Sequence, residues 1–172
     1  MMKAVIVIIM GSRSDEAHSR KIAEAATRLG LTCELRVASA HKTPADLLDI
    51  LAAYESDGRP KVYITVAGRS NALSGFVDGA VGAPVLACPP LSESYGGADL
   101  WSSLRMPSGI APALVMDPAN AALFAAKILA LSDPALSEAI AVEREARAAE
   151  LRAADAELRA SASSTWASGD AR

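Results

Sequence analysis

The feature that most constrains the fold is an alternation of short apolar runs with amphipathic segments along most of the chain. Residues 4–10 form an unbroken apolar run, and apolar side chains then recur at helical spacing through residues 15–29. Unbroken apolar runs indicate strands buried on both faces, as in a parallel sheet covered by helices. The expected strands are 4–10, 31–37, 62–67, 84–87 and 113–116, and the expected helices are 15–29, 44–56, a short one from 72, 119–131 and 134–159.

Strands that alternate with helices predict parallel β-α-β units joined by right-handed crossovers. We therefore expect a three-layer α/β/α fold with a doubly wound parallel sheet, flavodoxin-like, and a long C-terminal helix. A chain of 172 residues fits one domain. We place that domain at residues 1–160 and expect 161–172 to be a frayed tail.

Composition excludes several classes of protein. Apolar residues make up 51% of the chain, and the formal net charge is −3 with no basic run, which argues against nucleic-acid binding. No apolar run approaches the roughly 20 residues of a membrane span. Lys3 and the apolar run after it resemble a signal peptide only faintly, because charged Arg13, Asp15 and Glu16 stand where small cleavage-site residues belong. Two cysteines are too few for a disulfide framework, so we expect a cytoplasmic protein.

Ligands of doubly wound sheets bind beyond the carboxyl ends of the strands. The first loop at that edge holds Gly11, Ser12 and Ser14 just before a helix, whose unpaired N–H groups favour an anion. An ordinary helix cap made by Ser14 or Asp15 explains the same residues, and both interpretations remain open. The loops expected at this edge are 11–14, 38–43, 68–71 and 88–98.

The second loop, "ASAHKTP" at residues 38–44, contains one of the two histidines. His41 follows a strand and lies beside Ser39 and Lys42. A histidine titrates near neutrality and suits proton transfer, and the position of His41 on the expected ligand edge favours a functional role. His18 lies within the first expected helix, where we expect it to be solvated.

The third and fourth loops are also rich in small and polar residues. Gly68, Ser70 and Asn71 suit closure around a small polar group, although Asn71 also fits a helix N-cap. Residues 87–112 form a long irregular segment, which is typical of a functional loop or a subunit contact.

Four segments from these regions, "MGSRSD", "SAHKTP", "AGRSNALSGFVDG" and "LRMPSGIAPALV", together closely resemble the aminoimidazole ribonucleotide (AIR) carboxylase family of purine biosynthesis. The resemblance covers about residues 4–135 and implies an enzyme of one of two branches. One branch is a mutase that moves a carboxylate from the N5-carboxylated nucleotide to C4. The other, class II, takes CO2 directly and makes the same 4-carboxy product. The mutase usually carries "SAHRT" and "GGAAHL", whereas this chain has Lys42 and "GRSNAL", which resemble class II.

The resemblance also implies roles for individual residues. Ser12 holds the substrate phosphate, with Lys42 as a counter-charge. Asp15 accepts hydrogen bonds from the ribose hydroxyls. His41 is the base that removes the C4 proton after C4 has attacked CO2.

Other residues of the pocket follow from the same resemblance. Ser39, Gly68 and Ser70 complete the pocket for the nucleotide and the carboxylate. Arg69 and Asn71 either touch the carboxylate or brace the loop, and neither is assigned a role.

No cofactor is expected. The histidines and cysteines show no metal-ligand spacing, no Walker motif indicates ATP, and biotin has no role where the enamine-like ring supplies the nucleophilic carbon. The family forms symmetric homo-oligomers, so we expect a tetramer or an octamer. Trp101, Leu104 and Met106 are apolar groups that suit cover, and the last helix fits either packing on a neighbour or a solvated helix with i,i+4 ion pairs.

Two other classes share this fold. A flavodoxin-like binding protein needs aromatic residues around a flavin, and only Tyr95 and Trp101 lie near the expected edge. A receiver-like signalling domain needs an aspartate at the end of the third strand, where this chain reads "VAGRS".

Overall fold

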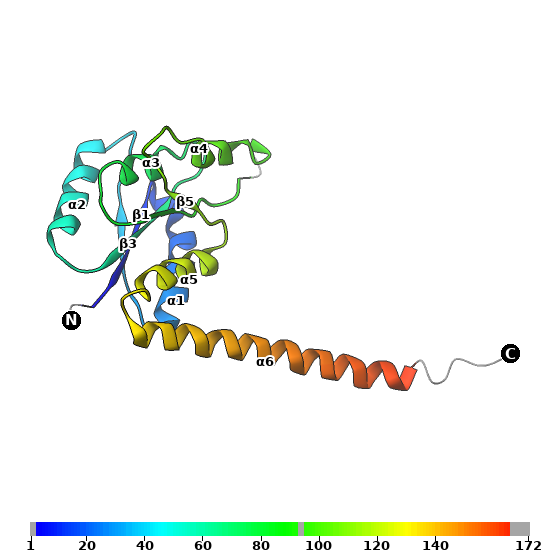
Figure 1. Ribbon diagram of the computed structural model, residues 1–172. Helices are drawn as coiled ribbons and strands as arrows, with labels where there is room; N and C mark the ends of the chain where they lie inside the picture. Colours follow the sequence, from blue (N-terminus) through cyan, green and yellow to red (C-terminus); the bar gives the residue numbers. More distant parts are fainter. Residues whose placement is uncertain (1–2, 93–94, 166–172) are drawn as a thin grey trace.

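The computed structural model describes residues 3–92 and 95–165, with side chains to Ser161. Its centre is a five-stranded sheet with the order β2-β1-β3-β4-β5 (Figure 1), and all pairings are parallel. This is the flavodoxin-like order of doubly wound folds, and the expected fold class is confirmed. The strands are β1 (Val5–Met10), β2 (Thr32–Val37), β3 (Lys61–Val66), β4 (Val85–Ala87) and β5 (Ala113–Leu114).

Helices cover both faces of the sheet. Ile6 and Ile8 of β1 share a core with α1 and α5, and Val5 and Val7 share the opposite core with α2 and α3. Every residue of β1 is buried, which explains its unbroken apolar sequence. The helices are α1 (Glu16–Arg28), α2 (Pro44–Ser56), α3 (Ala72–Asp78), α4 (Trp101–Leu104), α5 (Pro118–Leu129) and α6 (Pro134–Thr165).

The start of the first helix differs from the sequence prediction. Residues Arg13–Asp15 form a separate 3-10 turn, and α1 begins only at Glu16. The turn lies between the end of β1 and the first turn of α1, at the carboxyl edge of the sheet.

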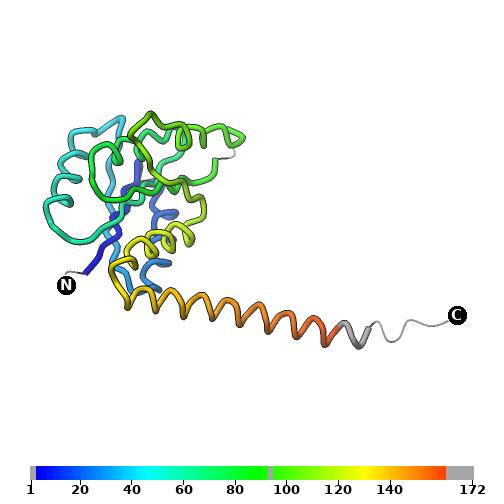
Figure 2. Tube along the Cα trace, in the orientation of Figure 1, coloured from blue at the N-terminus to red at the C-terminus, as the bar shows by residue number. Residues whose placement is uncertain are grey.

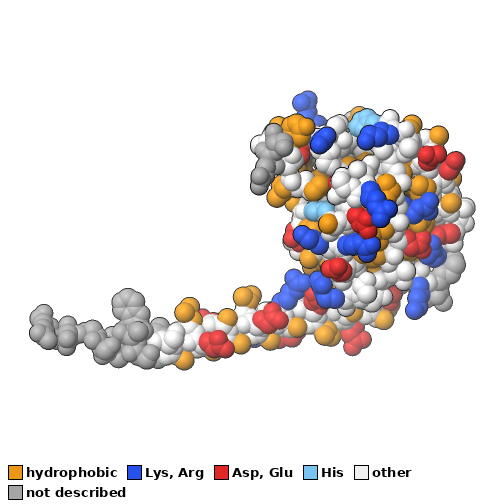
Figure 3. All heavy atoms as spheres, turned by 180° about the vertical axis from the view of Figure 1, so that it is seen from behind, with side chains coloured by type: hydrophobic (Ala, Val, Ile, Leu, Met, Phe, Trp, Pro, Cys, Tyr) orange, Lys and Arg blue, Asp and Glu red, His pale blue; other side chains and the backbone are white. Residues whose placement is uncertain are grey.

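The C-terminal helix is longer than the sequence predicted. α6 packs against the core through Leu136 and Ile140 and then projects away from the rest of the molecule (Figures 1, 2 and 3). The helix was expected to end near residue 159 but continues to Thr165, so residues 161–165 of the expected tail belong to this helix. Alanine favours helix, and no glycine or proline interrupts this stretch. The rest of the expected tail, 166–172, lies outside the described residues.

The projecting part of α6 carries both charged and apolar side chains. Arg147 forms an i,i+4 ion pair with Glu143 at 2.6 Å, whereas Leu151 and Leu158 are 74% and 69% exposed. Within residues 3–92 and 95–165, no helix is both long and apolar enough to cross a membrane.

Candidate functional site

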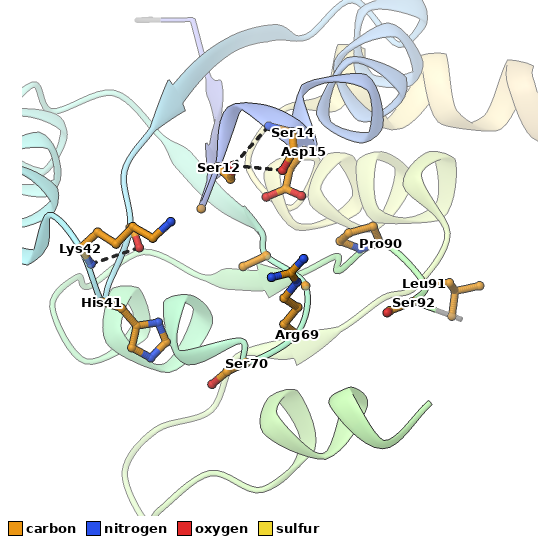
Figure 4. A pocket seen from close by; sticks show the side chains of 14 residues that line it. Ser12, Ser14, Asp15, His41, Lys42, Arg69, Ser70, Pro90, Leu91 and Ser92 are labelled. Carbon is orange, nitrogen blue, oxygen red and sulfur yellow. Dashed lines mark hydrogen bonds between the residues drawn. The ribbon is translucent and has the colours of Figure 1, made fainter. Parts of the chain in front are cut away.

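A pocket of about 730 Å³ opens at the carboxyl edge of the sheet. Loops that follow β1, β2, β3 and β4 all contribute to it, as Figure 4 shows. Every site residue that the sequence predicted lies on its wall, although the four loops are far apart in the sequence. The lining residues are Gly11, Ser12, Ser14, Asp15, Ser39, His41, Lys42, Ala67, Gly68, Arg69, Ser70, Pro90, Leu91 and Ser92.

The loop after β1 passes close to the end of β3. The Gly11 amide donates to the Val66 carbonyl at 2.9 Å. A Cβ atom at Gly11 would lie 3.3 Å from the Cβ of Ala67, tighter than most such contacts. Glycine therefore permits the close approach of these two loops, and both Gly11 and Ala67 line the pocket.

Ser12 caps the 3-10 turn, whereas the sequence suggested Ser14 or Asp15 as the cap of the helix that follows. Its Oγ accepts hydrogen bonds from the Ser14 amide at 3.3 Å and from the Ser14 hydroxyl at 3.0 Å. Both contacts use Ser12 Oγ as acceptor, so its own hydroxyl hydrogen remains free to donate into the pocket. Capping and anion binding are therefore compatible at this residue.

Asp15 is half-buried beside Ser12 and is the N-cap residue of α1, yet its side chain makes no capping hydrogen bond. Burial raises the pKa of the Asp15 carboxyl, while a hydrogen bond with the Ser12 backbone and the proximity of His18 partly oppose that shift. The Asp15 carboxylate is thus a desolvated acceptor that faces the pocket (Figure 4).

The loop after β2 is closed by contacts between Ser39 and Thr43. The Thr43 amide donates to the Ser39 carbonyl at 2.9 Å, and the Ser39 amide donates to Thr43 Oγ1 at 3.0 Å. Ser39 Oγ accepts from the Lys42 amide at 3.2 Å. This closure holds His41 and Lys42 at the tip of the loop, where both side chains are exposed on the pocket wall.

The loop after β3 is held on both sides. Gly68 packs near Pro90, to which a Cβ atom would be 3.5 Å away. Asn71 is 2% exposed, caps α3 through Ser74, and donates from Nδ2 to Ser103 Oγ at 2.8 Å. Asn71 therefore braces the loop from behind and is not on the pocket wall, which settles the N-cap alternative in favour of a cap.

His18 lies outside this pocket, but the expectation that it is solvated is wrong. It is half-buried, with Nε2 at 3.5 Å from the Sγ of Cys88, which follows β4. Burial is the main cause that lowers the pKa of His18. α1 crosses the end of β4 at this point, a contact that the local sequence does not reveal.

The sequence did not single out several residues of the pocket wall. Arg69 belongs to the third loop and was left without a role, and Pro90, Leu91 and Ser92 come from the long segment after β4. The run "CPPLS" directly after a buried strand was the available signal for these last three residues. Among the described residues, no three His, Cys, Asp or Glu side chains lie close enough together to hold a metal ion.

The fold and the pocket together define a doubly wound α/β protein with a polar small-molecule site at the carboxyl edge of its sheet. Helix-terminal donors, a carboxylate, a histidine and two cationic side chains face one cavity. Such a site suits a small anionic ligand with hydroxyl groups.

Comparison with known proteins identifies the family. The family model described as AIR carboxylase matches residues 5–150, and the chain therefore belongs to the AIR carboxylase family of enzymes. The chain is similar to a Treponema denticola protein named phosphoribosylaminoimidazole carboxylase, with 52% identity over 139 residues, covering 81% of this chain and 87% of the relative. A protein of the same name from Archaeoglobus fulgidus is 54% identical over 139 residues, covering 81% of this chain and 75% of the relative.

A solved structure supports the same conclusion. The crystal structure of Treponema denticola PurE superimposes with a TM-score of 0.89 at 49% sequence identity, covering 91% of this chain and 99% of that chain. The family resemblance inferred from the four sequence segments is confirmed.

Proposed function

We propose that the pocket binds 5-aminoimidazole ribonucleotide and that the protein adds CO2 to its C4 atom, giving 4-carboxy-5-aminoimidazole ribonucleotide without ATP, metal or biotin. The observation that carries this proposal is the convergence of Ser12, Asp15, His41 and Lys42 on one cavity in a chain of the AIR carboxylase family. The names of the relatives support the carboxylase activity.

The phosphate group of the substrate would lie at the start of the 3-10 turn. Ser12 has a hydroxyl hydrogen to donate there, and the first N–H groups of a helical segment favour a dianion. Lys42 extends its ammonium group toward this side of the pocket (Figure 4) and supplies a counter-charge. The half-buried Asp15 carboxylate would accept hydrogen bonds from the ribose hydroxyls, and Ser39, Gly68 and Ser70 would enclose the ring and the new carboxylate.

The proposed reaction needs one proton acceptor. The electron-rich C4 atom attacks the carbon of CO2, a C–C bond forms, and one C=O electron pair moves onto oxygen to give the carboxylate. C4 is then tetrahedral and still carries its hydrogen. His41 takes this proton, and the electrons of the C–H bond restore the aromatic ring. The rest of the site positions CO2 and excludes water.

A mutase acting on the N5-carboxylated nucleotide is the alternative within the family. Lys42 and the "GRSNAL" sequence at residues 68–73 favour direct use of CO2. The test supplies either aminoimidazole ribonucleotide with bicarbonate or the N5-carboxylated nucleotide while CO2 is continuously scavenged, both without ATP. We expect product only in the first reaction. Efficient conversion in the second would assign the protein to the mutase branch.

We also propose a cytoplasmic homo-oligomer, a tetramer or an octamer. Trp101 and Leu104 of α4 are 63% and 55% exposed, and Leu91 on the pocket rim is 79% exposed. Large apolar side chains that are exposed to this extent suit burial by a second subunit. Light scattering coupled to gel filtration measures the mass, and a monomer at micromolar concentration would contradict this proposal.

A further inference from the structure

Arg69 has a backbone conformation that arginine rarely adopts. Its φ angle is +62°, and it is the only non-glycine residue with positive φ among the described residues. Glycine adopts this region readily, whereas a side chain makes it strained. Strain of this kind persists where the surrounding structure imposes it, typically at functional sites.

The surroundings of Arg69 impose that conformation. On one side, Gly68 lies against Pro90. On the other, Asn71 is buried, and its backbone amide donates to Ser102 Oγ at 2.9 Å. Because the loop is anchored at both ends, the chain must turn sharply between these residues. Glycine would make that turn without strain, so the presence of arginine there points to a use for its side chain.

The side chain of Arg69 reaches into the pocket. Figure 4 shows the guanidinium group above the cavity, on the side of Asp15, between the first and third loops. None of the ion pairs within the described part of the chain includes Arg69. Its side chain is exposed rather than packed. The guanidinium group is therefore a positive charge on the pocket wall that no carboxylate within residues 3–92 and 95–165 pairs with.

The charges of the proposed reaction require such a group. The substrate phosphate carries close to two negative charges, and Ser12, the helical N–H groups and Lys42 lie together to receive it. As C4 attacks neutral CO2, a further negative charge develops on the two CO2 oxygens. A fixed positive group aimed at that position stabilises the transition state more than the ground state.

We propose that Arg69 binds the carboxylate that forms at C4 and thereby selects the 4-carboxylated nucleotide over uncharged analogues. This inference rests on the proposed function and assigns a role within the same site. A guanidinium group offers two parallel N–H donors that match both oxygens of a carboxylate, whereas lysine acts as a point charge suited to phosphate. The two cationic side chains of the pocket thus serve the two anionic groups of the product.

The test compares two ligands that differ in one charge. The 4-carboxylated nucleotide and its 4-carboxamide counterpart have nearly the same shape, but only the first carries the carboxylate. Calorimetry on the wild-type protein should show tighter binding of the carboxylate. Arg69→Gly should weaken binding of the carboxylated nucleotide about 10- to 100-fold, since a hydrogen-bonded charge is lost, and should leave binding of the carboxamide nearly unchanged.

Arg69→Gly also controls for folding, because glycine fits the observed φ. Its melting temperature should stay close to that of the wild type, and Arg69→Lys should lose part of the preference, because it keeps the charge but not the fork. Equal weakening for both ligands would make Arg69 a phosphate or ribose contact, and no weakening would make it a solvated residue. Either result overturns the inference while leaving the proposed function intact. If the wild-type protein binds neither nucleotide, the proposed function itself fails, and this inference fails with it.

Discussion

Polar side chains are arranged differently at the two ends of the parallel strands, the amino edge and the carboxyl edge of the sheet. At the amino edge, Arg59 donates to Glu34 at 2.8 Å and to Asp57 at 2.7 Å. Lys61 also pairs with Asp57 at 3.2 Å, and the Tyr54 hydroxyl donates to Glu34 at 2.7 Å. Each of these side chains therefore has a hydrogen-bond or ion-pair partner within the chain.

A second contact at the amino edge follows the same pattern. The buried Tyr63 hydroxyl donates to Glu55 at 2.9 Å, and the other oxygen of Glu55 accepts from the Gly82 amide at 3.0 Å. Burial is the main cause that raises the pKa of Tyr63, and the hydrogen bond to Glu55 raises it further, so the phenol stays protonated.

At the carboxyl edge, Asp15, His41, Lys42 and Arg69 face one cavity, and no ion pair within the described residues joins any of them. Unpaired charges therefore mark the edge at which a ligand binds. Paired charges at the amino edge hold loops and strands together. These four side chains at the carboxyl edge form no ion pair within residues 3–92 and 95–165 and can instead bind a ligand. Substitutions should therefore change stability at one edge and activity at the other.

The largest expected effect belongs to His41. His41→Asn keeps a polar side chain but cannot carry a proton near neutral pH. We expect kcat to fall at least about 10²-fold, because general acid–base groups contribute on this scale, while nucleotide affinity changes little. Steady-state kinetics and calorimetry measure the two quantities. His18→Asn is the matched control, because His18 is the other histidine of the chain and lies outside the pocket. This variant should leave kcat close to that of the wild type.

Two outcomes would contradict the role of His41. A large loss of binding would make it a substrate clamp, and normal turnover would assign the proton to another group. Solvent deuterium gives a direct measurement. During decarboxylation of the 4-carboxylated nucleotide, the wild type should install deuterium at C4, and the variant should do so only at its own reduced rate.

Ser12→Ala should have the next largest effect on activity. It removes a donor to a charged phosphate, a contact that contributes roughly 1.5–3 kcal/mol, so KM should rise about 10-fold or more. It also removes the acceptor of the Ser14 amide, which should lower the melting temperature slightly. An unchanged KM together with a lowered melting temperature would mean that Ser12 serves only as a cap.

Arg59→Ala tests the amino edge. It should lower the melting temperature at pH 7 and leave kcat/KM unchanged, the reverse of the effects expected at the pocket. Hydrogen bonds from Arg59 are the main cause that lowers the pKa of Asp57 to about 2. A carboxyl group whose pKa is lower in the folded protein stabilises the fold at pH values above its pKa in the unfolded chain. That stabilisation is lost as the pH falls through the pKa of the folded protein.

The stability difference between wild type and Arg59→Ala should therefore narrow as the pH falls from about 4 toward 2. Thermal unfolding recorded across that range measures it. A difference that stays constant with pH would show that Arg59 acts through packing alone.

The smallest expected effect is a gain in stability from Asp15→Asn. Burial raises the pKa of Asp15 in the folded protein. The protonated carboxyl group therefore contributes fully to stability when the pH is below its pKa in the unfolded chain, and this contribution is lost as the pH rises through its pKa in the folded protein. At pH 7 the charged carboxylate is then a cost, and the neutral amide of asparagine removes it. We expect a slightly higher melting temperature at pH 7, no gain at pH 3, and weaker nucleotide binding. A lower melting temperature at pH 7 would contradict the pKa direction.

Much of the fold was predictable because its signals are local. The apolar run at residues 4–10 and the helix expected at 44–56 match β1 and α2 to within a residue. The predicted end of the last helix was wrong because the sequence signal there is weak. The Ala- and Ser-rich end of α6 has no apolar periodicity, yet it continues as helix to Thr165, because helix propensity does not require a buried face.

The candidate site was predictable in part for a topological reason. Carboxyl ends of parallel strands meet at one edge, so the polar residues after β1, β2 and β3 had to gather there. The sequence could not assign Arg69, because its role depends on a backbone angle imposed by contacts of Gly68 and Asn71 with segments after β4.

The order of strands and helices, the loops that carry the site and the family resemblance could all be inferred from the sequence alone. These follow from hydrophobic periodicity, turn residues and motifs, all of which act over short stretches of chain. The structure was needed to show that Ser12 is the cap of the 3-10 turn, that Asn71 faces inward, that His18 is half-buried beside Cys88, and that Arg69 lies on the pocket wall. For the last three, the deciding contacts join residues far apart in the chain, and for Ser12 it is the geometry of a tight turn. No local pattern specifies either.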